Sequence, residues 1–147
     1  AEDDEERRGS HDLARVGGKY SDEWHRAHLA DPRSVVPESV MPPYAFLERT
    51  ELSVDDIADQ LKANRMVGVP YTDDMIANAK ADLIAQATPD ADGVDAFKQR
   101  YAKAEARDFD GDPKRLTEMD AVIAYMQMLG TLVDFKTYQA DAPENRR

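Results

Sequence analysis

The chain contains no cysteine among its 147 residues. Thiol catalysis and disulfide bonds are therefore excluded within these residues, and zinc centres built on cysteine are excluded with them. The absence leaves the redox compartment open, because it fits a reducing cytosol and also a secreted segment that needs no disulfide.

Basic residues are also scarce. Nineteen Lys and Arg stand against 30 Asp and Glu, which gives a formal net charge of -11. Nucleic-acid affinity depends mainly on phosphate neutralisation by Lys and Arg, so this charge argues against nucleic-acid binding and favours a partner with a basic surface. No apolar run reaches the roughly 18 residues that a membrane-spanning helix needs. We therefore expect no membrane span in this chain.

Sequence patterns of common enzymes are missing as well. The chain has no Gly-x-Ser-x-Gly hydrolase motif and no glycine-rich loop of the Walker or dinucleotide-binding type. Its many acids are too widespread to indicate a catalytic pair. We do not expect the isolated chain to be an enzyme.

The length corresponds to about one domain. Residues 1–11 are mostly charged and are expected to form a disordered tail or the remnant of an expression tag, and residues from about 136 to 147 a flexible C-terminal tail. Between them, no segment alternates convincingly with the period of a strand. We therefore predict an all-α fold.

Five helical segments are predicted from caps and apolar periodicity. The first runs from Ser21 to Asp31 and is followed by extended backbone over residues 33–44. The second follows Ser53 and ends at Gly68. The others are predicted from Thr72, over residues 93–107, and from Thr117 to Gly130, the last with an apolar stripe of Met119, Val122, Ile123 and Met126.

Two groups of residues invite a metal interpretation. His25 and His28 are spaced i, i+3 on a helix, but no further His or Cys pair completes a zinc site, so surface or packing roles are favoured. Asp108, Asp110 and Asp112 alternate in a turn. An EF-hand needs glycine at its sixth position and glutamate at its twelfth, and neither is present, so a solvated turn is the better interpretation.

Met41 lies in the proline-rich run from Pro37 to Tyr44. A thioether on a proline-stiffened loop is how c-type cytochromes supply the sixth ligand of haem iron, and an axial methionine raises the reduction potential. Methionine in such a position is more often loop filler or core packing. Covalent haem attachment also requires a Cys-x-x-Cys-His motif, which a chain without cysteine lacks.

The surrounding sequence resembles a known family. The runs DLARVGGKYSDEWHRAHL (residues 12–29) and DPRSVVPESVMPPY (residues 31–44) closely resemble the mono-haem cytochrome c subunit, subunit II, of cbb3-type cytochrome c oxidases. The runs GVPYT (residues 68–72) and LTEMDAVIAYMQMLGT (residues 116–131) are similar to later parts of the same subunit. The resemblance extends from residue 12 to about residue 135.

The resemblance implies a periplasm-facing electron-transfer subunit that carries haem c and is anchored to the inner membrane in the full-length protein. Its partners would be the catalytic haem-copper subunit, the dihaem cytochrome subunit and a donor cytochrome c. By position in the motif, Met41 matches the axial iron ligand. Arg15, Tyr20, Trp24 and Arg33 match positions near the haem, where Arg and Trp are able to donate to propionates.

This chain departs from the family pattern because it lacks the haem-attachment motif. We therefore expect a truncated class I cytochrome c-like domain over residues 12–135, redox-silent by itself, with a helical insertion over residues 51–114 between the methionine loop and the last helix. The apolar stripe of that last helix must then find another surface, dimerise or stay exposed. The alternative function is an acidic helical protein-interaction module without haem, in which Met41 is only structural.

Overall fold

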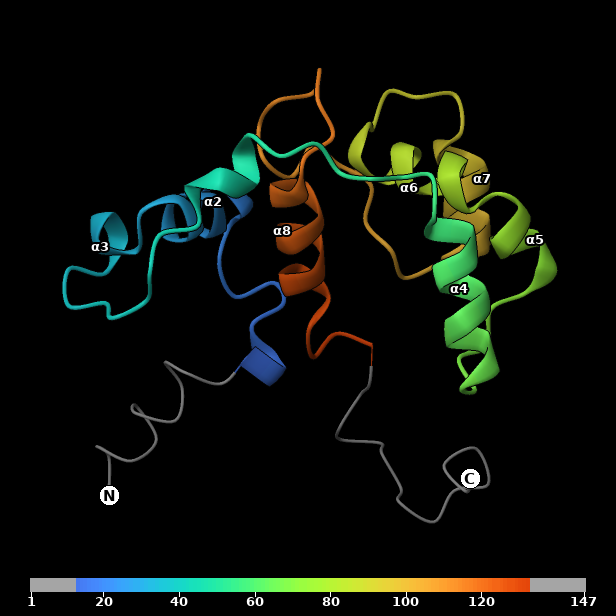
Figure 1. Cartoon of the computed structure of the whole chain (residues 1–147), viewed down its shortest axis with the longest axis horizontal. Helices are drawn as coiled ribbons and strands as arrows, with labels where there is room; N and C mark the ends of the chain where they lie inside the picture. The colour runs from blue at the N-terminus through green and yellow to red at the C-terminus, as the bar shows by residue number, and fades with distance from the viewer. Residues whose placement is uncertain (1–12, 133–147) are drawn as a thin grey trace, which may run out of the picture.

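The computed structural model describes residues 13–132, with the side chain of Ala14 excepted. This part of the chain contains α-helices and short 3-10 helices and no strand, which confirms the predicted all-α fold. In Figure 1, helix α8 (Glu118–Met128) stands in the centre. Helices α2 (Asp22–Ala30) and α3 (Pro32–Val35) lie on one side of it, and helices α4 to α7 lie on the other.

Helix α2 begins and ends as the sequence predicts. The Ser21 hydroxyl accepts a hydrogen bond from the Trp24 amide at 3.1 Å, and acidic Asp22 and Glu23 follow at the positive end of the helix dipole. Asp31 ends the helix in an extended conformation, as expected for a residue before proline. A 3-10 turn, η1 (Leu13–Arg15), precedes α2.

The extended backbone predicted over residues 33–44 is wrong for its first part. Helix α3 covers Pro32–Val35, because proline at the first helical position has a suitable φ and loses no needed N–H donor. No regular element covers residues 36–44, and the 3-10 turn η2 follows over Ala45–Glu48.

Four helices fill the middle of the chain, namely α4 (Ile57–Met66), α5 (Asp73–Ala77), α6 (Ala79–Ala87) and α7 (Val94–Arg100). Three boundaries differ from prediction. Asp56, rather than Ser53, occupies the N-cap of α4. The helix predicted from Thr72 breaks at Asn78, whose side-chain amide donates to the Asp74 carbonyl at 2.9 Å. The helix predicted over residues 93–107 ends at Arg100.

These middle helices share an apolar cluster and a buried ion pair. Leu61, Ile76 and Ala79 are buried together, and Tyr71 packs against them. The guanidinium of Arg100 donates to both carboxylate oxygens of buried Asp82, at 2.5 and 2.8 Å. This bidentate geometry provides hydrogen-bond donors to both oxygens of the buried carboxylate.

Helix α8 is held at its start by a capping box. The Thr117 hydroxyl accepts from the Asp120 amide, and the Asp120 carboxylate accepts from the Thr117 amide at 3.0 Å. Antiparallel pairing of Glu51 with Thr117 connects this start to the segment that precedes α4.

The apolar stripe of α8 finds a partner within the described chain. Met119 and Ile123 are fully buried and cluster with Phe109, and Leu29 of α2 and Leu47 of η2 pack against them. The sequence left open whether the stripe finds another surface, dimerises or stays exposed. For Met119 and Ile123 the structure shows that it finds another surface within the chain. Val122 and Met126 are only partly buried.

The segment before α2 is fixed to the end of α8. The Gly17 amide donates to the Leu129 carbonyl at 2.9 Å, and the Gln127 side chain both accepts from the Gly18 amide and donates to the Tyr20 carbonyl. A Cβ atom on Gly17 would lie 2.4 Å from the Gln127 carbonyl oxygen, so only glycine fits there.

Candidate functional site: the methionine loop and helix α2

The loop that carries Met41 is tied to α2 and α3 at both ends. Arg33 of α3 donates through Nε to the Ser39 carbonyl at 3.2 Å, and the Ser39 hydroxyl accepts from the Met41 amide at 3.2 Å. After Met41, the Tyr44 amide donates to the Leu29 carbonyl of α2 at 2.7 Å. These bonds fix the backbone on either side of the thioether.

The loop leaves apolar side chains in contact with solvent. Met41 is only partly buried, and its neighbour Val40 is 96% exposed. Neither side chain is used as core packing in the way that Met119 is. Such exposure fits a loop that presents Met41 to a group outside the described residues.

Three rings stack in a row along α2 and the residue before its cap. Tyr20 lies 4.0 Å from Trp24 between ring centroids, and Trp24 lies 4.7 Å from His28, with both pairs nearly parallel. Offset stacking of this kind favours a fixed arrangement of the three rings. Burial lowers the pKa of His28 from its ordinary value.

His25 lies on the inner side of the same helix and is 2% exposed. The rings of Tyr20 and Trp24 meet it edge-on, at 6.0 and 5.5 Å between centroids. Burial lowers the pKa of His25, an effect that nearby Asp22 opposes and His28 reinforces. The imidazole is therefore neutral at pH 7.

The residues predicted to surround a cofactor are only partly brought together. Tyr20 and Trp24 are in direct ring contact, and Arg33 holds the loop of Met41. Arg15 is exposed at the end of η1. Of the surface or packing roles favoured for His25 from the sequence, the structure shows the packing role, with the ring 2% exposed.

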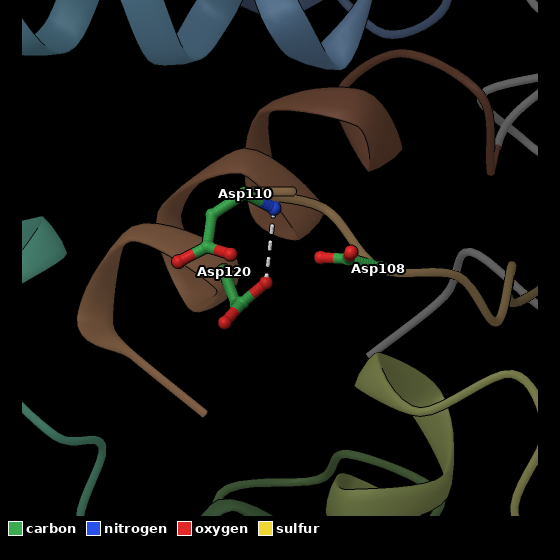
Figure 2. Close-up of side chains that lie close together, drawn as sticks. All are labelled: Asp108, Asp110 and Asp120. Carbon is green, nitrogen blue, oxygen red and sulfur yellow. Dashed lines mark hydrogen bonds between the residues drawn. The ribbon is translucent and has the colours of Figure 1, made fainter. Parts of the chain in front are cut away.

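A second cluster lies at the start of α8, where Asp108, Asp110 and Asp120 place carboxylate oxygens within 4.8 Å of one another (Figure 2). Asp120 takes the place that the sequence pattern gave to Asp112. Among the described residues, His25 and His28 belong to no group of three potential metal ligands.

The oxygens of this cluster are already used inside the protein. Asp120 accepts from the Asp110 amide at 3.1 Å, the bond drawn in Figure 2, and Asp110 accepts from the Thr117 hydroxyl at 2.7 Å. The Asp108 carboxylate accepts from the Gly111 amide at 2.8 Å. Burial raises the pKa of Asp120 from its ordinary value. The arrangement is that of a helix cap.

Comparison with known families identifies the chain over most of its length. The family described as cytochrome c oxidase, mono-haem subunit (FixO), matches residues 5–133, which is most of the chain. The chain belongs to the FixO family. No curated protein sequence matches it.

Membership of the FixO family confirms the resemblance seen in the sequence and identifies the chain with the mono-haem cytochrome c subunit of cbb3-type oxidases, a class of respiratory electron-transfer protein. The family belongs to the oxidase complex, whose catalytic subunit is therefore the partner of its members. In the part of this FixO-family chain that the structure describes, every helix is too short or too polar to cross a bilayer.

The side chains of this FixO-family chain fit the ligand part of a haem site but not the attachment part. Met41 offers a thioether on a fixed loop, and a buried imidazole atom without a partner lies on the adjoining helix. Attachment does not fit these residues, because none of the 147 is cysteine.

Proposed function

We propose that this chain supplies the methionine-ligand loop and the C-terminal helix of a haem c domain that passes electrons to the haem-copper catalytic subunit of a cbb3-type oxidase. Bound haem supplies a one-electron carrier whose potential depends on axial ligands, burial and nearby charge. Its covalent attachment requires a Cys-x-x-Cys-His motif outside these residues.

The observation that carries this proposal is the double attachment of the Met41 loop. Hydrogen bonds from Arg33 to Ser39 and from Tyr44 to Leu29 hold the segment on both sides of Met41. The Met41 side chain itself is only partly buried. A thioether ligand bonds iron weakly, so a preformed loop lowers the entropy cost of ligation. Family membership makes haem iron the relevant metal.

Other residues have supporting roles in this proposal. Tyr20 and Trp24 form a stacked aromatic pair at the start of α2, and Arg33 is a cation that holds the loop through its bond to Ser39. Arg15 is a surface cation close in sequence to this aromatic pair. Without haem the chain has no redox centre and no catalytic role of its own.

The domain division and location are part of the same proposal. Residues 12–135 form the cytochrome c-like unit and residues 51–114 an insertion within it, while the tails proposed for residues 1–11 and 136–147 lie outside the described residues. The domain faces the periplasm, is anchored at the inner membrane in the full-length protein, and receives electrons from the dihaem subunit or a donor cytochrome c.

Expression of the chain with its natural preceding sequence, in a host that matures c-type cytochromes, tests this function. The expected result is covalently bound haem after denaturing electrophoresis, together with oxidase activity when the other subunits are present. A chain that stays colourless and still assembles with a basic partner would support the alternative of an acidic interaction module.

A further inference from the structure

The Nε2 atom of His25 has no hydrogen-bond partner. It is the one such case among buried side-chain nitrogen and oxygen atoms of the part of the chain that the structure describes. Buried polar groups are nearly always paired, because leaving one unpaired costs its full desolvation free energy. An exception of this kind requires an explanation.

The neighbours of His25 within the described chain do not provide a partner. The rings of Tyr20 and Trp24 stand edge-on to the imidazole, so they offer no strong acceptor. The Asp22 carboxylate is engaged by Arg107 and Gln127. Burial keeps the imidazole neutral, and a neutral imidazole has one N–H to donate and one nitrogen that accepts.

The position of His25 relates it to the methionine loop. His25 lies one helical turn before Leu29, whose carbonyl accepts the Tyr44 amide that ends the loop. The loop that carries Met41 is therefore attached to the same helix as His25. The strong hydrogen-bond acceptors on the periphery of haem c are its two propionate carboxylates.

We propose that His25 donates a hydrogen bond through Nε2 to a haem propionate when the domain carries its cofactor. This inference rests on the proposed function and extends it, because it assigns a cofactor contact to a residue outside the methionine loop. It also explains why the polar imidazole of His25 lies on the interior side of α2, because its Nε2 atom gains a hydrogen-bond partner when haem is bound.

Two variants test the contact, each measured on the chain as it stands and on the haem-loaded domain. In His25→Leu, the chain without haem is expected to melt at the same or a higher temperature, because the unpaired atom is gone. The loaded form is expected to melt lower and to have a lower reduction potential, since the propionate charge is less compensated and favours ferric iron. His25→Gln retains a donor and should restore most of the potential.

A control variant and a spectroscopic measurement complete the test. Phe97→Leu, in the buried core of α7, is expected to lower the melting temperature of both forms and to leave the potential unchanged. In the reduced, loaded domain, the imidazole Nε2–H of His25 is expected as a slowly exchanging proton in a 15N-resolved NMR spectrum, and it should be absent from the chain without haem.

The inference is overturned if His25→Leu lowers the stability of the loaded form while the potential stays constant, because the partner is then a peptide carbonyl rather than haem. It is overturned equally if the variant lowers the stability of both forms alike. These results differ from failure of the proposed function. That failure would appear as a domain without haem, or as a haem whose spectrum and potential do not change when Met41 is replaced.

Discussion

The middle helices α4 to α7 and the outer segments, residues 13–50 and 108–132, both bury hydrogen-bonded carboxylates, and they differ at one buried imidazole. In the middle helices the buried Asp82 carboxylate is paired twice with Arg100. In the outer segments the buried His25 nitrogen is left unpaired. Both regions expose apolar residues, Val40 in one and Met66 in the other, so exposure alone does not separate them.

The difference indicates where the molecule is complete. A buried group that is hydrogen-bonded within the chain needs no further partner, whereas an unpaired one requires an explanation such as a partner that is not part of the chain. The middle helices therefore behave as a self-sufficient support. The outer segments carry the loop of Met41 and are the part that holds haem in the proposed function.

The largest effect is expected from truncating the two apolar clusters. Ile123→Ala removes a fully buried side chain of the outer cluster and should cost about 3–4 kcal/mol, while Leu61→Ala in the middle cluster should cost about 2–3 kcal/mol. Hydrogen exchange is expected to show Ile123→Ala loosening α2 and α8 before α4 and α6. Equal loosening of all helices would show that the two regions unfold as one unit.

Gly17 gives the next largest effect. Gly17→Ala places a Cβ atom 2.4 Å from the Gln127 carbonyl oxygen and should cost roughly 2–3 kcal/mol in the free energy of unfolding, because backbone must move. Gly18→Ala is the control, since its site is open and only its φ of 73° is unfavourable, at a cost of about 1 kcal/mol. Denaturant unfolding measures both, and a reversed order would refute the close approach.

Arg107 connects the two regions, because its side chain pairs with Asp22 of α2 and its amide donates to the Gln86 carbonyl of α6. Arg107→Ala should cost about 1 kcal/mol, since Asp22 is partly buried and loses a charged donor. The matched variant Arg65→Ala breaks an exposed pair with Asp73 and should cost at most about 0.5 kcal/mol. Equal losses of unfolding free energy in the two variants would mean that the Arg107–Asp22 pair contributes no more than an exposed surface pair.

The smallest effect is a pH dependence confined to the outer segments. The folded pKa values of His25 and His28 lie below the ordinary 6.5, so the unfolded chain binds protons first as the pH falls. Stability should therefore be full above about pH 6.5 and decline as the pH falls from there towards the lowered pKa values. Melting between pH 5 and 7 measures this decline, and His25→Leu should reduce it. A slope unaffected by that variant would locate the titration elsewhere.

The sequence predicted the features that depend on local chemistry. Ser21 and Thr117 cap helices as expected, because their side chains satisfy amides only three residues away. The break at Asn78 was missed, since the surrounding apolar spacing continues across it and a side-chain bond to Asp74 decides the outcome. Pro32 was interpreted only as a helix end, although proline also starts helices.

The candidate site was predictable only in its residue types. The proline-flanked Met41 indicated a ligand loop, but its attachment to Leu29 comes from tertiary packing that no spacing reveals. The association of Asp120 with Asp108 and Asp110 likewise depends on how the turn folds back on α8. Two partners of the stripe of α8 could not be foreseen, because Leu29 and Leu47 lie far from it in sequence.

The reduction potential of the haem-loaded domain with Met41→Ala tests the central claim most directly. We predict that this variant loses the sixth-ligand spectrum of a His and Met haem and shifts to a clearly lower potential, because the thioether favours ferrous iron. Met66→Ala, at the exposed end of α4, should leave both unchanged. An unaltered spectrum and potential in Met41→Ala would contradict the account.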